Sequence, residues 1–125
     1  MKNSVVTLIA RKKLAMARKG DIELPVVAGV ALGNGAEQNG TVKAPLAENI
    51  SLYNEIIRKA YATCTRLTET SYRYRIDLQK DELAGEVINE AALYDTDGDL
   101  LAIRTFVGKP KDEDMEMGFE FDDIF

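Results

Sequence analysis

Residues 87–107 read VINEAALYDTDGDLLAIRTFV, and this stretch decides the fold class. Two largely apolar runs, 87–94 and 100–107, flank the polar sequence DTDGD at 95–99. An Asp-Gly pair between two such runs favours a tight β-hairpin, because both residues tolerate the positive φ angles that its turn requires. The stretch therefore predicts an antiparallel hairpin with Asp97 and Gly98 at its tip.

Alternating patterns on both sides of this stretch predict further antiparallel strands. In residues 71–78, SYRYRIDL, apolar and polar side chains alternate with a period of two, which is typical of a half-buried strand. Residues 115–121, MEMGFEF, alternate in the same way, and residues 24–32 and 60–67 are also β-prone. We expect the following side chains to face the core: Tyr72, Tyr74, Ile76, Leu78, Leu93, Leu101 and Ile103. Met115, Met117, Phe119 and Phe121 share one face of the last strand, where they pack in the core or contact a neighbouring subunit.

Two segments favour helix. Ser4 is a suitable N-cap for a helix that runs to about Lys19, and Gly20 is a suitable C-terminal stop. A strand over residues 5–10 is the alternative for the start of this segment. Residues 48–59 have the spacing of a second, short helix. The predicted fold is α+β: one domain over residues 1–125, with an N-terminal helix packed on a mainly antiparallel sheet or meander of about five strands and one further short helix.

Composition argues against an enzyme. The chain has no His and a single cysteine, Cys64, so it lacks the commonest general base and any Cys-rich metal site. The acidic sequence at 95–99 suggests calcium, but it does not match the EF-hand spacing, and a hairpin turn explains the same residues. We therefore predict no catalytic residues, no cofactor and no metal site.

Charge and hydropathy also disfavour nucleic acid and membrane as partners. The net charge is −5, and alternation puts Tyr72 and Tyr74 on the opposite face from Arg73 and Arg75, so stacking and phosphate contacts do not share one surface. No apolar run approaches the roughly 18 residues of a membrane span, and the N-terminus does not resemble a secretion signal. We expect the chain to stay in the compartment where it is made.

The two ends of the chain differ in charge. Residues 1–20 contain six Lys and Arg residues and no acid, whereas residues 109–125 contain seven acids and two lysines. Either each set is a solvated surface, or the two ends attract each other, within one subunit or between neighbouring subunits. The terminal pair 124–125 is either an exposed apolar hook or the end of a core strand. The residues predicted to bind a partner are Lys12, Lys13, Arg18, Lys19, Glu120, Asp122, Asp123, Ile124 and Phe125.

Three segments resemble the N-terminal module of phage tail-collar fibre proteins. Residues 10–35, ARKKLAMARKGDIELPVVAGVALGNG, match its helix with an L-A-K-A-like stretch and its strand that ends in A-L-G-[DN]-G. Asn54, Glu55, Ile56 and Arg58 are similar to its N-E-V-x-R element. Residues 83–107, LAGEVINEAALYDTDGDLLAIRTFV, resemble its E-x-x-L-[FY]-D-x-D-G-x-L hairpin and the following A-I-x-x-F strand.

The resemblance implies a non-enzymatic structural protein of a phage or prophage tail, on the baseplate side, where it attaches fibres. Its location would be the virion tail, and the bacterial cytoplasm during assembly. Other tail and baseplate proteins would be its partners, together with copies of itself, most simply as a trimer. Fibre proteins continue into a shaft and a receptor-binding tip, whereas this chain ends at Phe125, so we expect an adaptor, a truncated relative or a separately encoded attachment piece.

The residues alone leave a second interpretation open. A free-standing bacterial binding or regulatory domain would use the edge of its hairpin or its Tyr-rich sheet to bind a peptide or a small ligand. A carboxylate-based hydrolase is less favoured, because the paired acids lie in polar runs that do not separate their pKa values.

Overall fold

A computed structural model describes residues 3–125 and contains one helix and ten strands. Lys2, one of the six basic residues near the N-terminus, lies outside the described residues. The elements, in chain order, are β1 (Ser4–Val6), α1 (Leu8–Lys19), β2 (Val27–Gly33), β3 (Glu37–Gln38), β4 (Thr41–Val42), β5 (Glu55–Ala60), β6 (Thr63–Thr68), β7 (Ser71–Leu78), β8 (Val87–Asp95), β9 (Leu100–Pro110) and β10 (Met117–Ile124).

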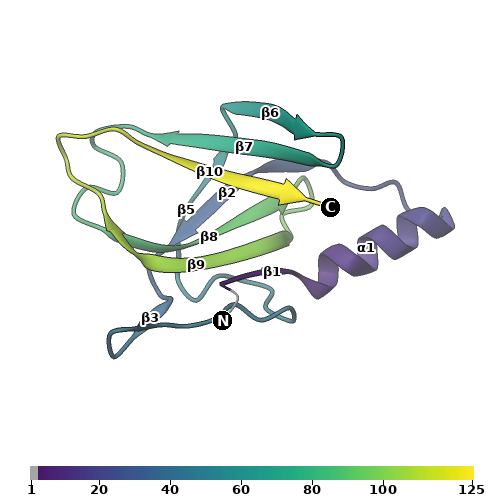
Figure 1. Cartoon of the computed structure of the whole chain (residues 1–125), viewed down its shortest axis with the longest axis horizontal. Helices are drawn as coiled ribbons and strands as arrows, with labels where there is room; N and C mark the ends of the chain where they lie inside the picture. Colours follow the sequence, from purple (N-terminus) through teal and green to yellow (C-terminus); the bar gives the residue numbers. More distant parts are fainter. Residues whose placement is uncertain (1–2) are drawn as a thin grey trace.

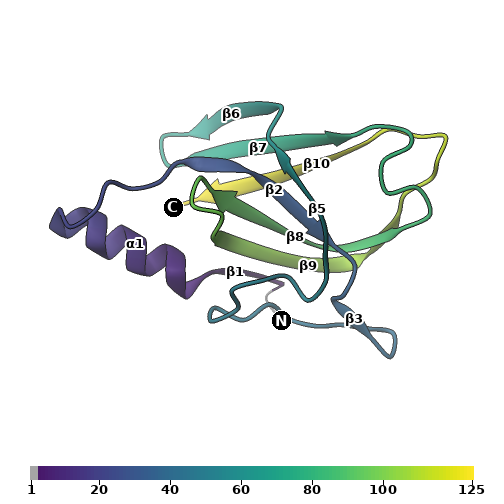
Figure 2. The same ribbon diagram turned by 180° about the vertical axis from the view of Figure 1, so that it is seen from behind.

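The strands form two stacked antiparallel sheets with the helix at one end (Figures 1 and 2). The first sheet has five strands in the order β1-β9-β8-β2-β5, and the second has three in the order β10-β7-β6. The pair β3-β4 is a small separate hairpin. The α+β class is confirmed, although the strands divide between two sheets rather than one meander.

The predicted hairpin is the centre of the larger sheet. β8 and β9 pair antiparallel, and Gly98 at the tip has a φ of 88°, which glycine adopts without strain. Six consecutive residues of β8, from Ile88 to Leu93, are buried. Because alternate side chains point to opposite faces, this strand is covered on both sides.

Two clusters of apolar side chains cover these two faces. The larger fills the space between the sheets and includes Val30, Leu32, Ile76, Leu78, Ile88, Leu93, Phe119 and Phe121. The smaller lies on the other face of the five-stranded sheet and consists of Ala31, Leu52, Ala92, Leu100 and Ile103. Leu101 packs against the first cluster, so Leu101 and Ile103 do not share one core as predicted.

The strands of the smaller sheet confirm part of the expected core. Ile76 and Leu78 are fully buried, and Phe119 and Phe121 are 9% and 4% exposed. Tyr74 and Met117 are partly buried against the same cluster. The prediction was wrong for Tyr72, which is 42% exposed and lies beside strand β6, all of whose residues are exposed. Met115, expected in the last strand, precedes β10 and is 37% exposed.

The first helix starts later than the sequence indicated. Thr7, not Ser4, is its N-cap, because the Thr7 hydroxyl accepts a hydrogen bond from the Ala10 N–H at 3.2 Å and donates one to the Leu100 carbonyl at 2.7 Å. Ser4 belongs to β1, which pairs with β9. Gly20 ends the helix as predicted, with a φ of 91° and its N–H bonded to the Ala17 carbonyl.

The predicted second helix over residues 48–59 is not formed. Residues 55–60 are strand β5, whose backbone pairs with β2 from Gly29 to Gly33. The adjacent β-branched residues Ile56 and Ile57 pack well in a sheet, and the free edge of β2 supplies the partner that a local pattern does not show.

Replacing Ile76 with Ala should reduce the free energy of unfolding by about 2–5 kcal/mol, because the side chain is fully enclosed between the sheets. Arg75→Ala, at the neighbouring position on the outer face, should change it by no more than about 0.5 kcal/mol. Urea denaturation measures both values. A larger loss of unfolding free energy for Arg75→Ala than for Ile76→Ala would show that Ile76 does not lie on the inner face of β7.

Candidate interaction surfaces

Lys13 is buried beneath the acidic turn between β8 and β9. Its ammonium lies 2.6 Å from Asp95 Oδ2, 2.7 Å from Asp99 Oδ2 and 3.1 Å from Asp97 Oδ2. Lys13 is 7% exposed and Asp95 is 1% exposed. The other carboxylate oxygen of Asp95 accepts the N–H groups of Asp97 and Asp99 at 3.0 and 3.1 Å, so this side chain also shapes the turn.

This arrangement explains the acidic turn without calcium. Within residues 3–125, the three aspartates form a group whose geometry could hold a metal ion, with ligand atoms within 4.8 Å of one another. The Lys13 ammonium already contacts a carboxylate oxygen of each of them. A side chain of the same protein therefore supplies the positive charge that the turn requires.

The protonation of Lys13 is strongly favoured. Burial alone would lower the pKa of its ammonium, but hydrogen bonds to Asp95, Asp99 and Asp97 outweigh burial and raise the pKa above its usual range. Lys13 was predicted to bind a partner. The structure places its charge inside the subunit, where it joins α1 to the hairpin.

Glu90 forms a second buried polar cluster on β8. Its carboxylate is fully buried and accepts the backbone N–H groups of Gly35 at 2.9 Å, Tyr53 at 2.7 Å and Asn54 at 2.8 Å. A Cβ at Gly33 would lie 2.5 Å from a Glu90 oxygen, which is why this position requires glycine. One carboxylate thus fixes the turn after β2 and the segment before β5.

Arg58 connects β5 to the same hairpin. Its guanidinium lies 4.6 Å from the centre of the Tyr94 ring and donates a hydrogen bond to the Gly98 carbonyl at 2.8 Å. Hydrogen bonding to Glu55 raises the pKa of Arg58 above its usual value. All three segments that resemble the tail-collar family therefore meet at β8 and β9.

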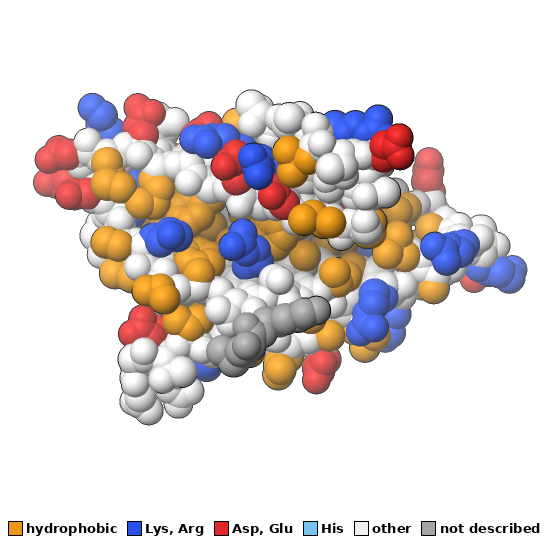
Figure 3. All heavy atoms as spheres, viewed as in Figure 1, with side chains coloured by type: hydrophobic (Ala, Val, Ile, Leu, Met, Phe, Trp, Pro, Cys, Tyr) orange, Lys and Arg blue, Asp and Glu red, His pale blue; other side chains and the backbone are white. Residues whose placement is uncertain are grey.

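The side of the sandwich between β1 and β10 is open. A hollow of about 670 Å³ there is lined by residues of β1, β9 and β10, among them Val5, Arg104 and Phe121. Figure 3 shows hydrophobic side chains gathered along this face with basic side chains among them. Arg104 lies 5.9 Å from the centre of the Phe121 ring and Lys109 lies 5.9 Å from that of Phe106, and within residues 3–125 neither forms an ion pair.

A smaller hollow lies between α1 and the C-terminal end of β10. It has a volume of about 280 Å³, and its lining includes Leu14, Leu24, Phe125 and Asp123. Burial raises the pKa of the Asp123 carboxyl above its usual value. In the described part of the chain, no ion pair or side-chain hydrogen bond involves Asp123.

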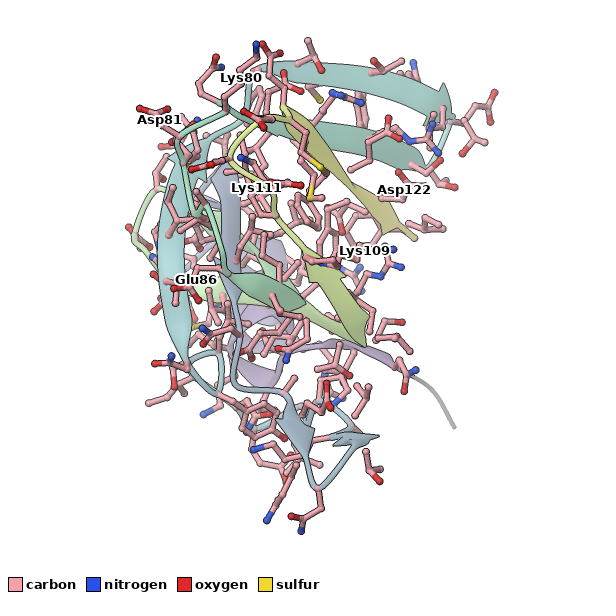
Figure 4. The ribbon with its side chains drawn as sticks, turned by 90° about the vertical axis from the view of Figure 1, so that its left-hand side faces the viewer. Lys80, Asp81, Glu86, Lys109, Lys111 and Asp122 are labelled. Carbon is pink, nitrogen blue, oxygen red and sulfur yellow. The ribbon has the colours of Figure 1, made fainter. Side chains whose placement is uncertain are left out.

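Lys111 is a buried cation that the sequence did not reveal. It is 1% exposed, and its ammonium donates to the carbonyls of Lys80 at 2.8 Å and Asp112 at 3.0 Å. Figure 4 shows Lys111 at the end of the sandwich opposite α1, below the loop that carries Lys80 and Asp81. The contacts join the β7–β8 loop to the segment after β9, so Lys111 adds nothing to the surface charge.

Most of the other predicted partner residues lie on the surface. Lys12, Arg18 and Lys19 are exposed on α1, and Glu120 is exposed on β10. Ile124 and Phe125 are 66% and 73% exposed, which favours the apolar hook over a core strand for these two residues. Asp122 is half-buried in an ion pair with Arg73 at 2.8 Å, and this hydrogen bond holds the pKa of Asp122 below its usual range.

The structure brings the two charged ends together only in part. The end of β10 lies beside α1 across the smaller hollow, whereas the acidic loop between β9 and β10 lies at the opposite end of the molecule (Figure 1). Within residues 3–125, no ion pair joins the basic residues of α1 to the acids of β10. The exposed charges of α1 and of this loop remain available for contacts between molecules.

Comparisons with known proteins gave no match: no family model, curated protein or solved structure is similar to this chain at the level required. Among the described residues, no helix combines the length and the apolar character that crossing a bilayer requires.

Replacing Lys13 with Met should reduce the free energy of unfolding by about 3–5 kcal/mol, because it leaves the buried carboxylate of Asp95 without its counter-ion. Lys12→Met, at the exposed neighbouring position, should change it by no more than about 0.5 kcal/mol. Urea denaturation of the two variants gives the comparison. Equal losses would show that the Lys13 contacts do not stabilise the fold.

Calcium should stabilise the Lys13→Met variant but not the natural protein. In the variant, three carboxylates lie close together without the ammonium, an arrangement that suits a hard cation. We expect millimolar CaCl₂ to raise the Tm of the variant and to leave that of the natural protein unchanged. Calorimetric titration of the natural protein should show no specific heat, and micromolar binding would contradict the structural interpretation of the turn.

The stability of the protein should fall above about pH 10. Burial raises the pKa of Tyr74 to about 12, so the folded protein keeps this proton while the unfolded chain loses it from about pH 10. Lys13 acts in the same direction. Because its pKa is raised in the folded protein, the folded protein keeps the Lys13 proton that the unfolded chain loses above about pH 10.4. Urea denaturation across this pH range measures the slope, which should be shallower in Tyr74→Phe and in Lys13→Met than in the natural protein.

Proposed function

We propose that this protein is a non-enzymatic structural module of a phage or prophage tail that attaches fibres to the baseplate. One observation carries the proposal. The three segments that resemble the tail-collar family are far apart in the sequence, yet their own side chains connect them around one hairpin. The contacts are Lys13 to Asp95, Glu90 to the N–H groups of Gly35 and Asn54, and Arg58 to Gly98.

These contacts support a structural use of the motifs. A catalytic carboxylate needs a free oxygen that can reach a substrate. Glu90 is fully buried and accepts three backbone N–H groups, and Asp95 binds Lys13 and two backbone N–H groups. The resembling segments therefore define a scaffold, and the surfaces that the scaffold presents are left for binding.

The proposed module works as one of several copies, most simply three, and also binds other tail or baseplate proteins. A repeated attachment piece must present the same surface at each position around the tail axis. The basic residues of α1 and the acidic loop before β10 lie at opposite ends of the molecule, which suits contacts between successive subunits (Figure 1). Charge would steer the first encounter of these ends.

The smaller hollow favours a second candidate function. It has a volume of about 280 Å³, is lined mainly by apolar side chains such as Leu14 and Leu24, and has Asp123 at its wall. A free-standing bacterial binding domain would use such a site for a small ligand or for a side chain of a peptide.

The location in the virion can be tested on particles from a bacterium that carries the gene. Particles purified after prophage induction are analysed by mass spectrometry, and immunogold labelling locates the protein on intact tails. We expect the protein in the particles and the label at the baseplate. A protein found only in the soluble fraction of the cell would contradict the tail proposal and favour the free-standing domain.

Self-assembly can be tested by sedimentation equilibrium. We expect a concentration-dependent oligomer that weakens with salt, because exposed charges are screened beyond about 8 Å at physiological ionic strength. Replacing Lys12, Arg18 and Lys19 with Glu should weaken it at low salt, whereas Glu37→Lys, on the small hairpin, serves as the control. A strict monomer at high concentration in low and high salt would rule out the self-assembly part of the proposal.

A further inference from the structure

The three-stranded sheet has two free edges. β10 and β6 each pair with β7 and with no other described strand. β10 pairs along its whole length, from Met117 to Ile124, without an irregularity, and all six residues of β6 are exposed. A free edge presents unpaired N–H and C=O groups, which readily pair with another strand.

The two edges carry opposite charge. β6 contains Arg66 and no acid, whereas β10 contains Glu120, Asp122 and Asp123 and no Lys or Arg. Pairing β10 with β10 of another copy would bring acids beside acids, which is destabilising. Pairing β6 with β10 joins edges of opposite charge.

The strand register shows which residues would meet. Arg66 is opposite Tyr72, and Tyr72 is opposite Asp123, so the three residues form one row across the sheet. Within one subunit, Arg66 and Asp123 are two strand spacings apart, about 9.6 Å. If a second copy continued the sheet in the same register, its Asp123 would lie beside Arg66 on the neighbouring strand.

The neighbouring rows fit the same arrangement. Thr65 would lie beside Asp122 of the second copy and Thr63 beside its Glu120, because each pair shares a row through Arg73 or Arg75. The threonine hydroxyls can donate hydrogen bonds to these carboxylates. None of these rows places two like charges side by side.

Among residues 3–125, neither member of the central pair has a charged partner within the subunit. The Arg66 guanidinium donates to the carbonyls of Thr68 and Glu69, at 3.2 and 3.3 Å, and lies 5.9 Å from the centre of the Tyr72 ring. Asp123 is half-buried, and in the described part of the chain it forms no ion pair. The sheet thus has an uncompensated cation at one edge and an uncompensated carboxylate at the other.

We propose that β6 of one copy pairs with β10 of the next, with Arg66 bound to Asp123 of the neighbouring copy. β6 and β10 both run antiparallel to β7, so the new pair is parallel and continues the sheet. The contact joins two different surfaces, so it gives a ring where the rotation closes and a filament where it does not. The proposal rests on the homo-oligomer in the proposed function and adds a strand-to-strand contact to the contact between its charged ends.

A charge exchange tests the ion pair. Arg66→Glu and Asp123→Arg should each raise the dissociation constant of the oligomer at least tenfold in low salt, since each brings like charges together. The double variant should return it to within about threefold of the natural protein. Sedimentation equilibrium measures the constants, and circular dichroism shows that each variant is folded. Glu37→Lys, which changes an exposed charge on the separate β3-β4 hairpin, serves as the control.

A disulfide tests the register even if a charge variant folds poorly. In a Cys64→Ser background, the single variants Arg66→Cys and Asp123→Cys are mixed and oxidised. We expect covalent dimers in the mixture but not in either variant alone. Within one subunit the two positions are about 9.6 Å apart, beyond the Cα separations of about 4.4–6.8 Å that a disulfide spans.

The outcomes separate this proposal from the one on which it rests. A strict monomer would overturn both the self-assembly and the edge pairing. An oligomer that is unaffected by either charge variant and gives no mixed disulfide would overturn the edge pairing alone. Covalent dimers of Arg66→Cys by itself would also overturn it, because they would show that β6 pairs with another β6.

Discussion

The central strand β8 is buried on both faces, so each of its polar side chains must find its partner inside the protein. Glu90 and Asp95 on this strand are 0% and 1% exposed. The first holds the turn after β2 and the segment before β5 through three backbone N–H groups, and the second holds α1 through Lys13. Segments that are distant in the sequence are thus tied to one strand, and a change at either carboxylate would disturb several elements together.

The sequence predicts those parts of the fold that depend on local patterns. The period of two in residues 71–78 and the Asp-Gly turn at 97–98 both gave strands at the expected places. Residues 55–60 were mistaken for part of a helix because their strand depends on pairing with β2, which no local pattern records. Ser4 was mistaken for the helix cap because Thr7, another residue suited to capping, lies three positions later and has the Leu100 carbonyl beside it.

The buried cations were harder to find than the strands. Lys13 lies three residues after the buried Ala10, so it is on the inner face of α1, and the spacing of aspartates at 95, 97 and 99 was a signal that a cation is needed there. Only the fold shows that helix and turn meet. Lys111 had no such signal, because its partners are the backbone carbonyls of Lys80 and Asp112, and any residue type supplies a carbonyl.

The charges on the free edges of the smaller sheet disfavour one kind of strand pairing between copies and allow another. A long, regular edge such as β10 would pair with copies of itself if its side chains were neutral. Its three acids prevent that contact by repulsion, but they do not repel β6, which has Arg66 and threonines at the matching rows. One edge of the five-stranded sheet limits association differently, since the edge strand β1 has only three residues. In the proposed assembly, charge selects the partner of β10, and shortness limits pairing at β1.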